Sequence, residues 1–157
     1  GKTYTKVYVN SDGNLTFGAG DGATADRSVA RFLTGAPRIA AVYSDLDPSS
    51  GGGVSYTQTD ATTLTISYTG VPVWGEGGTN TFTVTLTADG HITIGVDNAS
   101  VSSYIVGVSK GGAGNSGSQV DLAGASWTVP YGGFGALYQK FGSGNTLPDG
   151  AKITFSK

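Results

Sequence analysis

Strict alternation of polar and apolar residues is the main pattern along this chain. Residues 63–68 and 81–87 alternate threonine or serine with large apolar residues, without interruption. A period of two places successive side chains on opposite faces of a β-strand, so Phe82, Val84 and Leu86 share one face and the intervening threonines share the other. One buried face and one solvated face are typical of an antiparallel sheet. The alternation therefore predicts strands that cover a core from one side.

Turn sequences separate the alternating runs at short intervals. Asp12-Gly13 and Asp89-Gly90 each lie between two apolar runs, and Asp-Gly favours the positive φ angles of tight hairpin turns. Many short strands with glycine-rich turns are typical of a sandwich or barrel. We predict one all-β domain over residues 1–157, an antiparallel β-sandwich of about ten strands with Gly/Ser-rich loops. Beyond the two hairpins and the two alternating runs, strands are predicted at residues 39–46, 54–57, 104–109, 135–141 and 152–156.

The same pattern identifies the core and the one helical segment. A short helix is predicted between Asp26 and Leu33, with Asp26 or Ser28 as its N-cap, because both residue types accept hydrogen bonds from the first free N–H groups of a helix. Apolar side chains on the inward faces of the strands are expected to form the core. They are Val7, Val9, Leu15, Phe17, Ile39, Leu64, Ile66, Tyr68, Phe82, Val84, Leu86, Ile92, Ile94 and Ile153.

Three stretches of the chain together resemble a known family. Residues 7–18 read VYVNSDGNLTFG, residues 38–56 read RIAAVYSDLDPSSGGGVSY, and residues 82–96 read FTVTLTADGHITIGV. This order is similar to that of the nidogen-like (NIDO) domain, especially its versions in secreted bacterial proteins. The resemblance extends over about residues 4–109, although the chain lacks the cysteines of the animal modules. It implies an extracellular or cell-surface location, an adhesion-type role and no known enzymatic activity, and it supplies no functional residues to carry over.

Composition and charge exclude several classes of partner. Charged residues form 13% of the chain, and the formal net charge is −2 with no cluster of basic residues. A nucleic-acid-binding protein carries a basic face that this chain lacks. No apolar run approaches the roughly 20 residues that span a bilayer, and no polybasic segment is present to attract an anionic membrane. We therefore expect neither a nucleic-acid partner nor membrane insertion.

The residues that usually carry catalysis are scarce. The chain has no cysteine, and its one histidine, His91, follows a hairpin turn on the polar face of a strand. The common pairs of nucleophile and base need groups of this kind. Glutamate occurs once, at Glu76, so a pair of glutamates for glycoside hydrolysis is absent as well. We expect a protein that is not an enzyme, requires no cofactor, and binds a protein or glycan partner at the cell surface.

Two aspartates provide a candidate metal site. Asp45 and Asp47 are two residues apart at the end of a predicted strand, so their carboxylates lie on the same side. Calcium prefers oxygen ligands, and backbone carbonyls of residues 49–53 are close enough in sequence to complete such a site. The other interpretation is an Asp-Pro turn whose carboxylates accept hydrogen bonds from backbone N–H groups. The sequence leaves both interpretations open.

Aromatic residues in irregular segments provide a candidate glycan site. Trp74 lies in a loop with glycines, and Trp127 and Tyr131 lie on either side of Pro130. Exposed aromatic rings present an apolar face to a sugar ring while their polar edge stays free for hydroxyls. The other interpretation is that these rings close the ends of the core.

The N-terminal segment suggests a second type of function, that of an extracellular filament subunit. The chain begins at Gly1 without methionine, which favours a processed or excised chain, and both terminal segments have the pattern of strands. A strand donated to the open edge of a second copy would generate a head-to-tail fibre. The other interpretation is that the first strand pairs within its own sandwich. The candidate assembly residues are Tyr4, Lys6, Val7, Tyr8 and Val9.

Overall fold

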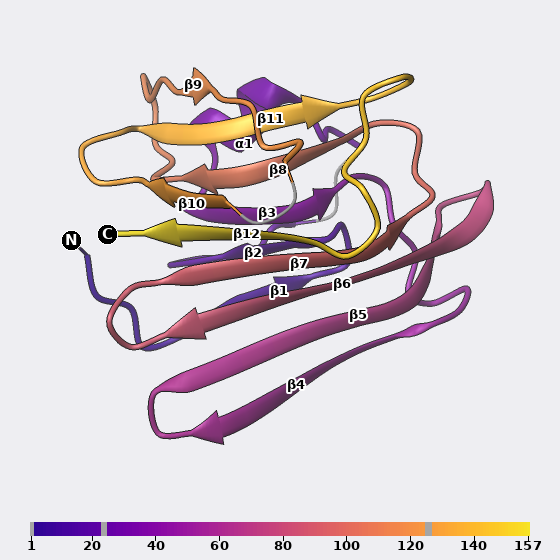
Figure 1. Cartoon of the computed structure of the whole chain (residues 1–157), viewed down its shortest axis with the longest axis horizontal. Helices are drawn as coiled ribbons and strands as arrows, with labels where there is room; N and C mark the ends of the chain where they lie inside the picture. The colour runs from indigo at the N-terminus through magenta and orange to yellow at the C-terminus, as the bar shows by residue number, and fades with distance from the viewer. Residues whose placement is uncertain (1, 23–24, 125–126) are drawn as a thin grey trace.

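Two six-stranded sheets pack face to face in the structure, which is a computed structural model (Figure 1). It describes residues 2–22, 25–124 and 127–157, with the backbone alone at Trp127. The first sheet has the strand order β1-β2-β3-β8-β11-β9. Its strands are β1 (Tyr8–Asn10), β2 (Asn14–Thr16), β3 (Arg38–Tyr43), β8 (Tyr104–Ser109), β11 (Ala136–Phe141) and β9 (Ser118–Gln119).

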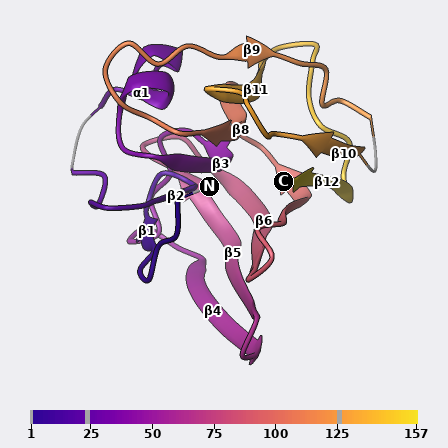
Figure 2. The same cartoon turned by 90° about the vertical axis from the view of Figure 1, so that its left-hand side faces the viewer.

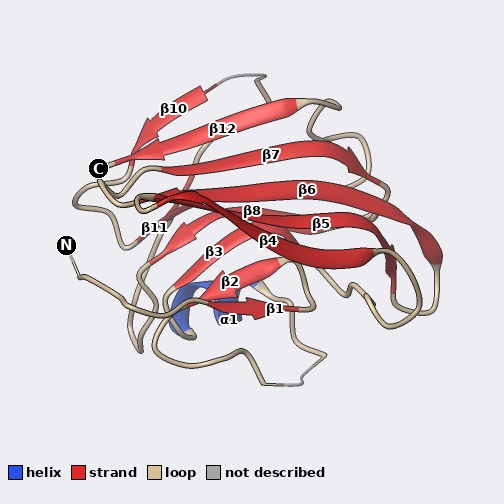
Figure 3. Cartoon of the chain, turned by 90° about the horizontal axis from the view of Figure 1, so that it is seen from below, coloured by secondary structure: helices blue, strands red, loops and turns tan. Residues whose placement is uncertain are grey.

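The second sheet has the strand order β10-β12-β7-β6-β5-β4 and forms the other layer of the sandwich (Figure 3). The two long alternating segments that the sequence identifies form β5 and β6, the longest strands of this sheet. The strands of this sheet are β10 (Trp127–Pro130), β12 (Ala151–Ser156), β7 (Ile92–Ala99), β6 (Gly77–Thr87), β5 (Thr63–Val73) and β4 (Gly53–Asp60).

The predicted β-sandwich is confirmed, but the sheets are mixed and not purely antiparallel. Strand β9 pairs with β11 in parallel, and β10 pairs with β12 in parallel. All the other strand pairs of the described residues are antiparallel. The parallel strands are two and four residues long, too short for a period of two to be recognised, which is why the sequence predicted about ten strands instead of these twelve.

The predicted helix is confirmed as α1 (Val29–Thr34) on the outer face of the first sheet (Figure 2). The side chain of Ser28 caps it by accepting a hydrogen bond from the backbone N–H of Arg31 at 3.1 Å. The helix is held by Phe32, which is fully buried. Phe32 packs with Ala40, Tyr43, Ile105 and Ala136 in a small cluster outside the main core.

The main core lies between the two sheets and matches the predicted inward faces with one exception. Eight predicted core residues are buried, and five others pack against the core at its margin. Val9 is the exception: it is 42% exposed. Its register partner Leu15 faces the core, so Val9 points inward, but β1 is an edge strand and a neighbour covers it on one side only. The buried eight are Leu15, Ile39, Ile66, Tyr68, Phe82, Val84, Ile94 and Ile153.

Candidate functional site

The two predicted calcium ligands lie just after β3, and each engages a different partner. Oδ1 of Asp45 lies 2.7 Å from Nη2 of Arg27. Asp47 accepts hydrogen bonds from the hydroxyls of Ser49 and Ser50, and from the backbone N–H of Ser49 at 3.0 Å. These bonds lower the pKa of Asp47. The contacts of Asp47 are those of an Asx-type turn. Calcium binding at this pair stays a prediction, and a cation that bridged both carboxylates would have to compete with Arg27.

The three predicted glycan-binding residues are not gathered at one site. Trp74 lies in the turn between β5 and β6 and is 62% exposed. Tyr131 lies after β10, at the other end of the sandwich, and its hydroxyl donates a hydrogen bond to the carbonyl of Gly90 at 2.8 Å. The side chain of Trp127 lies outside the described part of the chain. Glycan binding therefore stays a prediction, because the turn between β5 and β6 and the end of β10, which carry these two residues, lie at opposite ends of the sandwich (Figure 1).

The candidate assembly segment lies against its own sandwich. Residues 8–10 form β1, which pairs with β2, and Val7 packs against the core. The ring of Tyr4 lies 4.9 Å from that of Phe17, centroid to centroid. Lys6, Tyr8 and Val9 remain exposed. Strand donation by this segment stays a prediction, and it would require β1 to leave β2.

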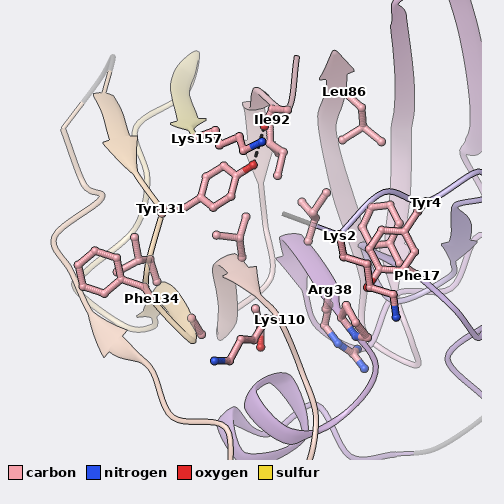
Figure 4. Close-up of a pocket in the computed structure, with 18 of the residues that line it drawn as sticks. Lys2, Tyr4, Phe17, Arg38, Leu86, Ile92, Lys110, Tyr131, Phe134 and Lys157 are labelled. Atoms are coloured by element: carbon pink, nitrogen blue, oxygen red, sulfur yellow. Dashed lines mark hydrogen bonds between the residues drawn. The ribbon is translucent and has the colours of Figure 1, made fainter. Parts of the chain in front are cut away.

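A broad pocket opens at the end of the sandwich where both ends of the described chain lie (Figures 1 and 4). Its volume is about 770 Å³, within the usual range of ligand sites. The floor combines apolar side chains from both sheets. Ile39, Val108 and Leu137 come from the first sheet, and Leu86 and Ile92 come from the second. Residues of the turn between β6 and β7 form part of its wall.

Aromatic and basic side chains form the rim of this end pocket. Phe134 is 50% exposed and follows Tyr131 in the segment between β10 and β11. Across the opening lie Tyr4 and Phe17 (Figure 4). Three lysines complete the rim from three separate parts of the chain: Lys2, Lys110 and Lys157.

Most polar groups of the pocket already have partners. Burial raises the pKa of Asp21, but hydrogen bonds and charge from Arg38 and Arg31 outweigh it and hold that pKa below its ordinary value. Arg38 lines the pocket and pairs with Asp21, which lies outside the lining and also binds Arg31. On the opposite rim, Asp89 accepts a hydrogen bond from the hydroxyl of Thr87, and its carboxylate lies 3.0 Å from Nδ1 of His91. These contacts lower the pKa of Asp89 and keep it anionic.

No group of three or more His, Cys, Asp or Glu side chains that could hold a metal ion occurs among the described residues. The His–Asp pair is exposed, and the neighbouring hydroxyl of Thr87 donates to the carboxylate of Asp89 and to the backbone carbonyl of His91. Within the same ranges, no helix is long and apolar enough to cross a membrane.

Sequence reasoning identified only part of this pocket. Tyr131 and Tyr4 were singled out, but for a glycan site and for assembly respectively. Phe134 and the rim lysines were missed, because they come from segments far apart in the sequence that meet only through the folded sheets. One signal was available: Phe134 is a large apolar residue flanked by glycines, in the sequence Gly-Gly-Phe-Gly, where no strand pattern buries it.

Comparison with known proteins agrees with the resemblance found in the sequence. The model of the NIDO-related family matches residues 1–133, which include every strand from β1 to β10. No curated protein and no solved structure matches the chain. Nidogen-like domains are non-catalytic modules and are generally extracellular. The chain belongs to the NIDO-related family.

Proposed function

We propose that this domain is a non-catalytic, extracellular adhesion-type module that holds a protein partner in the end pocket. The observation that carries the proposal is the exposed Phe134 beside a floor of apolar side chains from both sheets. Interfaces gain most of their free energy where a few large side chains enter apolar pockets. A rigid sandwich that presents its loops and a pocket at one end suits this task. The family supports a binding role, because its members are not known to be catalytic.

Site-specific photo-crosslinking tests where the partner binds. A photoreactive phenylalanine analogue is placed at Phe134, and in a matched variant at Ser143, which is exposed in the loop after β11. The two variants are incubated with extracellular and surface proteins of the source. We expect a discrete protein adduct from position 134 and none from position 143. Equal adducts from both positions, or adducts from neither, would contradict binding at the end pocket.

The free edge of the second sheet favours self-association as a second candidate function. Strand β4 is eight residues long, and every residue in it is exposed. Val54 and Tyr56 pair with Tyr68 and Ile66, which face the core, yet they are 37% and 74% exposed. Their register places them on the inward face of β4, and this strand extends beyond the first sheet (Figure 2). The other three edge strands, β1, β9 and β10, have only three, two and four residues.

A long exposed edge without lysine or proline is a template for another strand. Antiparallel pairing of β4 with its counterpart in a second copy fits this edge, because its one charged residue, Asp60, lies at the strand's end. In a register centred on Tyr56, Asp60 would lie opposite Gly52 of the second copy, so like charges would not meet. We expect a concentration-dependent dimer in analytical ultracentrifugation. Val54→Pro should abolish it, because proline removes a backbone donor that faces the free edge, whereas Ser143→Pro in a loop should not. A chain that stays monomeric at millimolar concentration would rule out this function.

A further inference from the structure

We infer that the segment bound in the end pocket is an acidic peptide with one large apolar anchor side chain. This inference rests on the proposed function and specifies its partner. It depends on three properties of the pocket: the excess of positive charge on its rim, the apolar character of its floor, and the shortage of free hydrogen-bonding groups inside it.

Free positive charge gathers at this opening, although the chain as a whole is negative. The chain contains six lysines and three arginines. Within the described part of the chain, each arginine forms a salt bridge with an aspartate, whereas no lysine forms one. Half of the lysines, Lys2, Lys110 and Lys157, line this one pocket. Asp89 is the one carboxylate among the lining residues, and it is already engaged by Thr87. A partner that complements this rim carries negative charge.

The interior of the pocket is suited to an apolar group. Its floor is formed by the aliphatic side chains of Ile39, Leu86, Ile92, Val108 and Leu137. Removing an apolar side chain of the partner from water against this floor is favourable in proportion to the area covered. The volume of about 770 Å³ leaves room for a large side chain together with its flanking backbone. The floor therefore selects an anchor such as tryptophan, phenylalanine or leucine.

The shortage of free polar groups favours a peptide over a sugar. A sugar presents hydroxyls on most of its carbons, and each hydroxyl that is buried without a hydrogen bond costs free energy. In this pocket the hydroxyl of Tyr131 donates to Gly90, and the hydroxyl of Ser109 donates to Leu33. The guanidinium of Arg38 is held by Asp21. The side-chain donors that remain lie toward the rim, among them Thr3, Tyr4 and the three lysines, and the lysines suit carboxylates at the edge of the pocket and not hydroxyls at its floor.

Three fluorescein-labelled nonapeptides test the inference by fluorescence polarisation at low salt. The first carries a central tryptophan between Asp and Glu residues, the second replaces the tryptophan with glycine, and the third replaces the acids with Gln and Asn. We expect only the first peptide to bind well, with each of the other two at least ~10-fold weaker. Raising the salt to about 0.5 M should weaken the first peptide several-fold, because exposed charges are screened. An oligogalacturonate serves as the acidic sugar probe.

Charge reversal on the protein provides the matched control. Lys2→Glu/Lys110→Glu should weaken the first peptide at least ~10-fold, whereas Lys140→Glu/Lys152→Glu, on exposed strand positions outside the pocket, should change it less than ~2-fold. If the acidic sugar or the tryptophan-free peptide binds as tightly as the first peptide, the site recognises polyanions and the inference is wrong. If no peptide binds but crosslinking at Phe134 finds a partner, the inference fails while the proposed function stands. If both experiments fail, the proposed function fails too.

Discussion

Arg38 shows how a single buried charge is accommodated in this fold. Its side chain is 1% exposed, and it reaches Asp21 in the segment that follows β2. Nη1 of Arg38 also donates a hydrogen bond to Oδ1 of Asn14 at 3.1 Å, and the guanidinium lies 4.7 Å from the ring centroid of Tyr43. The hydrophobic pattern gives no indication of this network, because an arginine at the start of a strand is normally solvated. It is therefore found only from the structure.

At the residue scale, Asp21→Asn should destabilise the protein by at least about 3 kcal/mol, because it leaves the buried charge of Arg38 without its carboxylate. The effect depends on pH with a definite sign. The pKa of Asp21 is lowered in the folded state, so the stabilisation is complete above the unfolded pKa of about 4 and is lost as pH falls through the lower folded value. Urea unfolding between pH 2 and pH 7 checks this prediction. As pH falls below 4, the free energy of unfolding of the variant should decrease less than that of the parent chain. Parallel plots of this free energy against pH would contradict the prediction.

At the scale of elements, the sequence predicts the strands that alternate and misses those that do not. Strands β5 and β6 lie where the pattern places them, because one face of each is buried in the core, whereas β8, also found where it was predicted, is buried on both faces. Strands β9 and β10 were missed, because their place depends on parallel pairing with β11 and β12, which come later in the chain. Val54 and Tyr56 show a second limit of prediction from sequence. Their apolar side chains predict a strand, but they do not show whether another sheet covers that strand.

The hairpin between β1 and β2 depends on Gly13 for two separate reasons. Its φ angle is +68°, and a Cβ added there would lie 2.1 Å from the carbonyl oxygen of Val42. Gly18 has a similar φ of +84° but no heavy atom within 4 Å of such a Cβ. Gly18→Ala should therefore cost about 1 kcal/mol from backbone strain alone, and Gly13→Ala about 3 kcal/mol or more. Thermal unfolding followed by circular dichroism measures both, and equal losses would show that the close approach to Val42 does not matter.

At the scale of the whole molecule, the end pocket illustrates why a binding site is harder to predict than a fold. Its lining includes Lys2 from the first residues, Val108 from the middle of the chain, and Leu137 and Lys157 from the last quarter. Each residue has an ordinary local reason to be where it is, as a strand position or a loop position. Only the pairing of β8 with β3 and β11 and the packing of the two sheets bring these segments together. The sequence shows the chemical character of each residue, but it does not show that these residues lie close together in the folded chain.

The N-terminal segment either stabilises its own sandwich or is donated to a second copy, and the two cases differ in how deletion of this segment changes the stability of the chain. In the structure β1 pairs with β2, the hydroxyl of Tyr68 donates a hydrogen bond to the carbonyl of Asn10 at 2.6 Å, and Tyr4 packs on Phe17. Deleting residues 1–9 removes this strand pairing and uncovers Leu15, so we expect a folded-state stability lower by about 3 kcal/mol or more. Urea unfolding measures the loss, and sizing chromatography measures the state of association. A truncated chain that keeps its full stability, while the intact chain polymerises and the truncated one does not, would contradict this expectation and favour the filament.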